Sequence, residues 1–244
     1  MRILQKKSLN LQAPRFLVDK PLNQEVEKFD VMSHLNRSSA TAIVGTSGSG
    51  KTSLLYSLLT HRKPNIWRKQ FESIIVVMPR ASRNSLKNNI FDKFIEPECL
   101  FDTLDDLSMD YIVARTSDNS EQGLHTLIVL DDVASALKDA EVAKKLQHLV
   151  YAYRHYRANI VVLVQTLRTI PLSIRKNLSN VIVFHKPRLV EWEAVVSEFL
   201  ELEKEPAKQL YTVLFQNKYD WALINLQTGK VYKKFDEVLY RDAT

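Results

Sequence analysis

Glycine is scarce in this chain, and most of it lies in one short segment. The 244 residues include only five glycines, and three of them fall within Gly45-Thr-Ser-Gly-Ser-Gly-Lys-Thr52. Glycine adopts backbone conformations that other residues avoid and lets a ligand come close to the main chain. The β-forming run Ala40–Val44 precedes this segment, and a helical pattern at Ser53–Thr60 follows it. The sequence therefore predicts a strand and a helix joined by a loop whose backbone is itself functional.

The loop fits the Gly-x4-Gly-Lys-Thr pattern of a phosphate-binding loop, in the strand-to-helix setting that the mechanism requires. Its backbone N–H groups would surround the phosphates, and the helix N-terminus would face the anion. We expect Lys51 to bridge the β- and γ-phosphates and Thr52 to bind Mg²⁺. A Gly/Ser loop that carries a lysine by chance is the alternative interpretation. The residues expected to bind the nucleotide are Gly45, Thr46, Ser47, Gly48, Ser49, Gly50, Lys51, Thr52 and Ser53.

Two aspartates follow the apolar run Leu127–Leu130, which has the form of a Walker B strand. In open parallel sheets, such a strand delivers its carboxylate to the carboxyl edge, where ligands bind. We expect Asp131 to hold Mg²⁺ through water and Asp132 to orient and polarise the attacking water as a general base. The alternative is a solvated strand end with two turn-forming aspartates.

A glutamine and an arginine complete the candidate catalytic set. Gln165 ends the apolar run Asn159–Val164, where its amide would lie beside the aspartates and sense the γ-phosphate. Arg154 precedes the same run, at the opposite end of the strand, so it would act on the nucleotide of a neighbouring subunit as an arginine finger. Arg157 and Arg175 are the alternatives for that role.

Apolar runs alternate with helical patterns along the chain. This alternation predicts an α/β fold with a mainly parallel sheet between layers of helices. The expected strands are 40–44, 73–78, 127–130, 159–164 and 181–184, and the expected helices are 53–60, 141–156 and 189–210, the last with a break at Pro206.

Three further segments have their own predictions. Residues 1–38 are expected to form an N-terminal arm or edge element, with a short strand at Phe16–Asp19, before an ATPase domain over residues 39–244. Residues 80–122 are expected to be irregular, with a short strand at Tyr111–Ala114. Residues 221–235 predict a C-terminal β-hairpin that turns at Gly229.

Composition excludes several classes of protein. The chain is 45% hydrophobic and 25% charged, which is typical of a globular protein and not of a disordered one. The single cysteine, Cys99, excludes an intramolecular disulfide and a cysteine-rich metal site. A net charge of +6 is compatible with a polyanionic partner. We find no apolar run of about 18 residues, so no membrane-spanning segment is expected.

One motif favours a different nucleotide. Asn217-Lys-Tyr-Asp220 has the Asn-Lys-x-Asp form with which GTPases read guanine. Against this, Asp131-Asp132 is followed by Val133-Ala134 and not by the Asp-x-x-Gly form that couples a GTPase switch to the γ-phosphate. A GTP-binding switch protein therefore stays as an alternative.

Taken together, these motifs resemble the FtsK/HerA superfamily of P-loop ATPases. More narrowly, the chain resembles the genome-packaging ATPases of nucleocytoplasmic large DNA viruses, of the poxvirus type, and of virophages. The resemblance covers most of residues 40–235. The residues that carry it are the loop Gly45–Thr52, the doubled Asp131-Asp132, the Arg154-His155 pair before the strand that ends at Gln165, and Ile170-Pro171 with Arg175-Lys-Asn177 before the strand Val181–Phe184.

The resemblance implies a RecA-like ASCE core and a homo-oligomeric ring of five or six copies. It also implies that hydrolysis of ATP with Mg²⁺ drives double-stranded DNA into a preformed viral capsid at a packaging vertex, with the protein in the host cytoplasm (the viral factory), the virion or both. Many members carry Glu where this chain has Asp132. Another ASCE ATPase, either a helicase or an AAA-like remodeller, is an alternative. The candidate DNA contacts are Arg80, Arg83, Lys87, Lys233 and Lys234.

Overall fold

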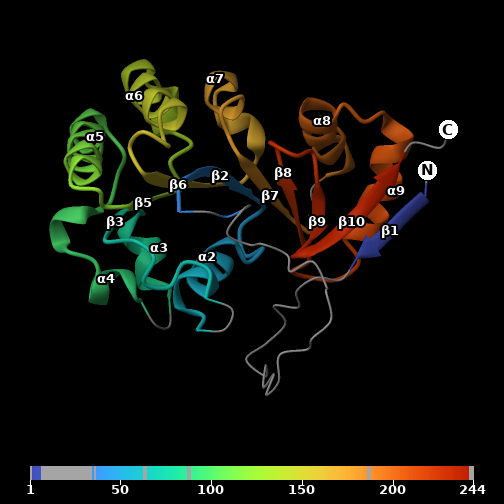
Figure 1. Cartoon of the computed structure of the whole chain (residues 1–244), viewed down its shortest axis with the longest axis horizontal. Coiled ribbons are helices and arrows are strands. Elements are labelled where there is room, and N and C mark those ends of the chain that lie inside the picture. Colours follow the sequence, from blue (N-terminus) through green and yellow to red (C-terminus); the bar gives the residue numbers. More distant parts are fainter. Residues whose placement is uncertain are drawn as a thin grey trace.

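A computed structural model describes residues 2–6, 35, 37–62, 65–86, 89–185 and 188–241. Its strands form a 10-stranded sheet in the order β1-β10-β9-β8-β7-β2-β6-β5-β3-β4 (Figure 1). The six strands from β7 to β4 are parallel, and the others extend the sheet antiparallel. The parallel strands are β2 (Ser39–Val44), β3 (Ser73–Val77), β4 (Leu100–Phe101), β5 (Thr126–Asp131), β6 (Ala158–Val164) and β7 (Asn180–Phe184).

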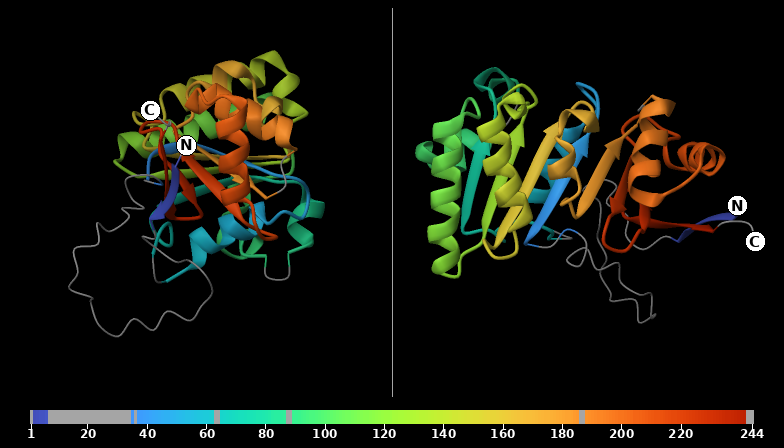
Figure 2. Two further views of the ribbon diagram at one scale, coloured as in Figure 1. Left: turned by 90° about the vertical axis from the view of Figure 1, so that its right-hand side faces the viewer. Right: turned by 90° about the horizontal axis from the view of Figure 1, so that it is seen from above.

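Helices cover both faces of the sheet, as Figures 1 and 2 show. One apolar cluster lies under the helices of one face, and a second lies under α2 and α4 on the other. All seven residues of β6 are buried, which explains its continuous apolar run. The first face carries α5 (Asp106–Glu121), α6 (Ala140–Tyr151), α7 (Leu172–Arg175), α8 (Leu189–Leu200) and α9 (Lys204–Leu214); the second carries α2 (Lys51–Thr60), α3 (Arg80–Asn84) and α4 (Phe91–Phe94). Single 3-10 turns lie at Pro97–Cys99, Ala136–Lys138 and Leu167–Thr169.

The register of the sheet brings four strand ends together. Val44 of β2 pairs with Val164 of β6 on one side and with Val183 of β7 on the other. Asp131 at the end of β5 pairs with Leu163 of β6. The residues that follow these positions therefore meet at one edge, which is where ligands bind in open α/β sheets. This confirms the expected parallel core.

The carboxyl-terminal part of the chain forms the antiparallel extension. Strands β8 (Trp221–Asn225) and β9 (Val231–Lys233) form the predicted hairpin, and Gly229 in its turn has a φ of 67°. Beyond them, β10 (Asp236–Arg241) pairs with β1 (Arg2–Lys6) at the edge of the sheet. The strand expected at 16–19 lies outside the described residues.

The expectation for residues 80–122 was wrong. This segment contains α3, α4, β4 and the long helix α5, and the strand expected at Tyr111–Ala114 lies inside α5. Asp105 caps α5 by accepting a hydrogen bond from the Ser108 N–H, while the Ser108 hydroxyl accepts one from the Asp105 N–H. Helix α5 buries the spaced side chains Met109, Ile112 and Thr116, a helical periodicity that the short run at 111–114 did not reveal.

The break expected at Pro206 lies earlier in the chain. Helix α8 ends at Leu200, and Glu201 adopts a left-handed conformation with a φ of 54°. Pro206 lies in the first turn of α9, where the backbone N–H that proline lacks has no helical partner. In the part of the chain that the structure describes, no helix has both the length and the apolar character needed to span a membrane.

Candidate nucleotide-binding site

The loop between β2 and α2 has the compact geometry that its glycines predict. Gly50 is the N-cap of α2 and has a φ of 108°, a conformation that other residues rarely adopt. A Cβ atom on Gly45 would lie 2.6 Å from Ser49 Oγ and 2.8 Å from Phe184 Cβ, so only glycine fits there. The Gly45 N–H donates to the Val164 carbonyl oxygen at 3.1 Å, which ties the loop to β6.

Lys51 is held over this loop by the loop's own carbonyl groups. Its ammonium donates to the carbonyl oxygens of Gly45 at 2.6 Å and of Thr46 at 3.1 Å. Burial lowers the pKa of Lys51, and the charges of Asp131 and Asp132 partly offset this effect. The ammonium therefore lies near both aspartates, as an interaction with phosphates beside a metal ion would require.

The Asp131 carboxylate lies at the end of β5 and is partly buried. Burial raises its pKa, with a smaller contribution from Asp132, whereas Lys51 and a hydrogen bond from the Thr52 hydroxyl lower it. A carboxylate and a hydroxyl are the hard oxygen ligands that Mg²⁺ takes together with water and phosphate. In the described ranges no cluster of three or more His, Cys, Asp or Glu side chains could hold a metal. The Asp131 carboxylate and the Thr52 hydroxyl thus fit a hard cation whose other ligands are water and phosphate oxygens.

Asp132 differs from its neighbour in conformation and exposure. It has a φ of 57°, the left-handed region that aspartate tolerates better than most residues. Its side chain is exposed and lines the same cavity as Lys51, Asp131 and Gln165. Thus one aspartate is partly buried beside Thr52 and Lys51, and the other is accessible to solvent. This arrangement suits the two roles predicted from the sequence.

Gln165 and the hydroxyls of the loop complete the cavity. Gln165 follows the last residue of β6, and its side chain is exposed at the edge where Gly45 follows β2. The Ser49 hydroxyl oxygen is buried without a hydrogen-bond partner among the described residues, as expected of a group that faces an anion. The cavity has a volume of about 1080 Å³. The loop residues Ser47 to Ser53 all line it.

Sequence reasoning missed one wall of this cavity. This wall comes from the end of β7, the start of β8 with the turn before it, and the turn between β9 and β10. Its residues are Phe184, Tyr219, Trp221, Lys234 and Phe235. Phe184 lies at the predicted strand end, but nothing in the local sequence says that it packs against Gly45. The pairing of β8 with β7 creates this wall.

The three candidate arginines lie in different places. Arg154 and Arg157 precede β6, so they lie at the end of the sheet opposite to the loop. Arg154 is exposed, and its Nε donates to the Tyr153 hydroxyl at 3.1 Å. Arg175 instead pairs with Glu198 at 2.7 Å and lines a second cavity of about 610 Å³ together with Gly45. The structure thus keeps Arg154 away from its own nucleotide site.

The aspartate of the guanine-type motif is already occupied. Asp220 is 2% exposed, and its carboxylate accepts a hydrogen bond from the Asn217 N–H at 2.9 Å and pairs with Lys234 at 3.2 Å and with Lys233 at 3.6 Å. Burial alone would raise the pKa of Asp220, but the Asn217 N–H and the two lysines outweigh it and lower that pKa. These interactions stabilise the loop, and they argue against guanine recognition by Asp220.

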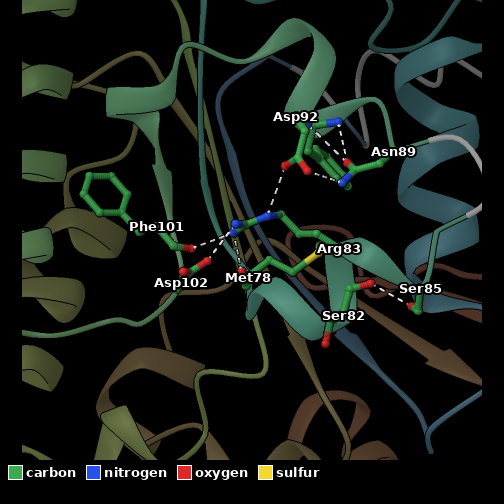
Figure 3. A network of polar contacts seen from close by, with 9 residues as sticks. Met78, Ser82, Arg83, Ser85, Asn89, Asp92, Phe101 and Asp102 are labelled. Atoms are coloured by element: carbon green, nitrogen blue, oxygen red, sulfur yellow. Dashed lines mark hydrogen bonds and ion pairs between the residues drawn. The ribbon is translucent and has the colours of Figure 1, made fainter.

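The DNA contacts considered from the sequence also have other partners. Arg83 is buried, and Figure 3 shows that its guanidinium donates to the Met78 carbonyl oxygen at 2.6 Å and pairs with Asp102 at 2.7 Å and with Asp92 at 3.2 Å. It therefore joins the ends of β3 and β4 to α4, and these partners argue against a role of Arg83 as a DNA contact. Arg80 is exposed, Lys87 lies outside the described residues, and Lys233 and Lys234 bind Asp220.

These features define a class of protein. The phosphate loop lies between the central strand β2 and helix α2. The polar residue Gln165 follows the neighbouring strand β6, and the two aspartates lie at the end of the next strand, β5. This arrangement is the site of a RecA-like P-loop nucleoside triphosphatase. The chain belongs to the poxvirus A32 protein family, whose model matches residues 26–193. It is thus a P-loop ATPase of the viral packaging type that the sequence motifs resemble. No curated protein matches the chain.

Solved structures share this fold at low sequence identity. The DNA-packaging ATPase B204 of Sulfolobus turreted icosahedral virus has a TM-score of 0.60 and 14% identity, over 80% of this chain and 95% of that chain. The genome-packaging NTPase B204 of Sulfolobus turreted icosahedral virus 2, in complex with ATP-γS, has a TM-score of 0.59 and 17% identity, over 80% and 96%. The pCW3 conjugation coupling protein TcpA, with ATPγS, has a TM-score of 0.53 and 15% identity, over 77% and 57%.

Proposed function

We propose that this ATPase is a double-stranded DNA translocase that packages a viral genome into a preformed capsid. The observation that carries the proposal is the convergence of Lys51, Asp131, Asp132 and Gln165 on one cavity at the carboxyl edge of the sheet. Membership in the poxvirus A32 protein family and the fold shared with B204 support it. The proposed location follows from that family: the viral factory in the host cytoplasm, the virion or both.

The proposed hydrolysis divides the work among these side chains. The Lys51 ammonium exchanges its loop carbonyl partners for the β- and γ-phosphate oxygens and stabilises the charge that develops between them. The exposed Asp132 carboxylate orients the attacking water and accepts its proton. The Gln165 amide lies within the same cavity and holds that water or the γ-phosphate in line.

The metal ion would be held by two residues of this chain. The Thr52 hydroxyl and the Asp131 carboxylate are the oxygen ligands that the site offers Mg²⁺, which when bound neutralises phosphate charge. The Asp131 carboxylate is partly buried beside Thr52 even without the ion, so the protein pre-organises it. ATP and Mg²⁺ are therefore the proposed cofactors.

The proposed assembly is a homo-oligomeric ring of five or six copies that contacts the capsid at its packaging vertex. Arg154 lies at the end of the sheet opposite to the phosphate loop, so it can complete a site only on another subunit. We assign Arg154 as the finger, with Arg157 as the alternative at the same end. Arg175, which Glu198 holds by an ion pair, lies beside its own loop. Residues 1–38 are proposed as an arm preceding an ATPase domain at 39–244.

Hydrolysis and movement on DNA can be tested separately. We expect ATP turnover that exceeds GTP turnover and that duplex DNA stimulates, together with displacement of a triplex-forming strand from linear duplex DNA. Lys51→Ala is expected to lower turnover by at least about 100-fold, because the ammonium acts on charge that develops in the transition state. Lys138→Ala is the matched control, since Lys138 is exposed and lines neither cavity. Turnover indifferent to duplex DNA, or unwinding of a forked duplex, would contradict the translocase proposal.

A further inference from the structure

The segment Asn217–Asp220 contributes Tyr219 to the aromatic wall of the nucleotide cavity, whereas its aspartate is held by other partners. The turn is closed by the Asp220 N–H, which donates to the Asn217 carbonyl oxygen at 3.1 Å. The Asp220 carbonyl oxygen also accepts from the His185 N–H at 2.7 Å, which fixes the turn to the end of β7. The side chain that this rigid turn presents to the cavity is Tyr219.

The position of the acidic residues decides which way a bound nucleotide runs. Asp131 ends β5 and Gln165 follows β6, both on one side of the loop in the sheet order, so the γ-phosphate lies on that side. Phe184 and Tyr219 lie on the other side, at the ends of β7 and before β8. The nucleobase must leave the phosphate loop toward the second side, because both ends of the nucleotide cannot lie beside the aspartates.

Tyr219 has the geometry of a stacking platform at that place. A Cβ atom on Gly50 would lie 3.6 Å from Tyr219 Cδ1, so the ring lies next to the residue before Lys51. Phe184 is 2% exposed, Trp221 6% and Phe235 0%, whereas Tyr219 is 52% exposed. The aromatic face that a base can reach in this wall is therefore that of Tyr219.

The backbone at this position supports the same role. Tyr219 has a φ of 68°, a conformation that bulky residues rarely adopt and that usually costs free energy. The hydrogen bonds and ion pairs of Asp220 hold the turn in that conformation. The Lys218 ammonium lies over one face of the Tyr219 ring, 4.8 Å from its centre, so the base would stack on the opposite face.

The geometry points to Tyr219 as the residue on which the nucleobase stacks, so that the base is held by its face and is not read by Asp220. This inference deepens the proposed function and depends on the nucleotide site proposed above. Stacking tolerates every base, since each has a π-face. Tyr219 therefore contributes affinity for the nucleoside but little discrimination between adenine and guanine.

The test compares ligands with and without a base. Binding of a non-hydrolysable ATP analogue, the GTP analogue and inorganic tripolyphosphate is measured by calorimetry for the wild type, Tyr219→Ala and Tyr219→Phe. We expect Tyr219→Ala to weaken both nucleotide analogues by about tenfold and to leave tripolyphosphate binding unchanged, because a lost base stack acts only on the base. Tyr219→Phe keeps the ring and should bind all three ligands like the wild type.

Two controls separate the possible failures. Phe94→Ala removes another exposed aromatic ring, 82% exposed on α4, and should change none of the three affinities. If the wild type binds tripolyphosphate but Tyr219→Ala keeps full affinity for both analogues, the stacking role is overturned while the phosphate site stands. A loss confined to the GTP analogue would also overturn it, since that is base reading and not stacking. If the wild type binds none of the three ligands, the nucleotide site itself fails.

Discussion

The Thr52 hydroxyl donates a hydrogen bond to the Asp131 carboxylate, which joins the first turn of α2 to the end of β5. The two residues are far apart in the sequence, and neither motif specifies the other. This contact would let both oxygen atoms bind the Mg²⁺ ion of the proposed mechanism.

The Asp131 carboxylate is expected to reduce the stability of the nucleotide-free protein. Burial raises its pKa, so the folded state binds the proton more tightly than the unfolded state. Stability from this group is therefore greatest at low pH and falls as the pH rises above its unfolded pKa. We expect Asp131→Asn to raise the melting temperature at pH 7 by about 2–4 °C, while abolishing ATP turnover.

Thermal unfolding from pH 4 to pH 8, without nucleotide, checks this prediction. The difference in melting temperature between Asp131→Asn and the wild type should shrink as the pH falls, because the wild-type carboxyl then becomes protonated. Addition of Mg²⁺ and a non-hydrolysable ATP analogue should stabilise the wild type more than the variant. A variant that is less stable than the wild type at pH 7 would contradict the prediction.

Gly45 is expected to tolerate no side chain. A Cβ atom there would meet Ser49 Oγ at 2.6 Å and Phe184 Cβ at 2.8 Å, so Gly45→Ala must move the loop or β7. We expect a loss of about 1–3 kcal/mol in the free energy of unfolding, together with loss of nucleotide affinity.

Gly123→Ala is the comparison for this substitution. Gly123, unlike Gly45, has a positive φ, 77°, and a Cβ atom there would have no neighbour within 4 Å. This variant should lose about 1 kcal/mol of stability through backbone strain alone and keep its nucleotide affinity. Urea unfolding and calorimetry measure the two effects; equal nucleotide affinity in both variants would refute the close approach at Gly45.

Arg83 is expected to stabilise the segment between β3 and β4 and not to bind DNA. Removal of its side chain leaves the Met78 carbonyl oxygen without its donor at 2.6 Å. It also leaves Asp92 and Asp102 without the cation that both of them pair with. We expect Arg83→Met to cost about 2 kcal/mol of unfolding free energy. In a DNA-binding titration, the dependence of affinity on salt should be the same as for the wild type.

The exposed Arg80, at the start of the same helix, provides the comparison. Arg80→Met should leave the unfolding free energy within about 0.5 kcal/mol of the wild type, since surface substitutions rarely cost more. A reduced salt slope in Arg83→Met, with unchanged stability, would show instead that its guanidinium contacts phosphate.

Arg154 and Lys51 are expected to complement one another between subunits. Each of Arg154→Ala and Lys51→Ala should be nearly inactive alone. In an equal mixture, about a quarter of the interfaces would join an intact loop to an intact arginine, and turnover should recover to that extent. The same experiment with Arg157→Ala, which should be active alone, is the control. If both variants assemble into mixed oligomers and no turnover returns, Arg154 is not the finger.

The sequence alone determined the local chemistry of this protein. The loop Gly45–Thr52, the aspartates after Leu130 and the strand end at Gln165 were all evident, because each is encoded by neighbouring residues of constrained type. The buried parallel strands were also predicted correctly, because a short continuous apolar run is typical of a strand that is buried on both faces. By contrast, α5 was missed because its burial follows a spacing of three and four residues. The catalytic roles assigned to Lys51, Asp132, Gln165 and Arg154 stay predictions.

Only the tertiary structure decided which distant residues share a cavity or a network. In the sequence, Arg83 is one basic residue among several. In the folded chain, α4 and the end of β4 place Asp92 and Asp102 beside it as ion-pair partners. Asp220 matches a guanine-reading motif in the sequence, but in the folded chain it pairs with Lys234. The exposed aromatic residue of that turn is Tyr219. The physical reason is that a side chain's function depends on its burial and its partners. Strand pairing across the whole chain sets both, whereas a local motif records neither.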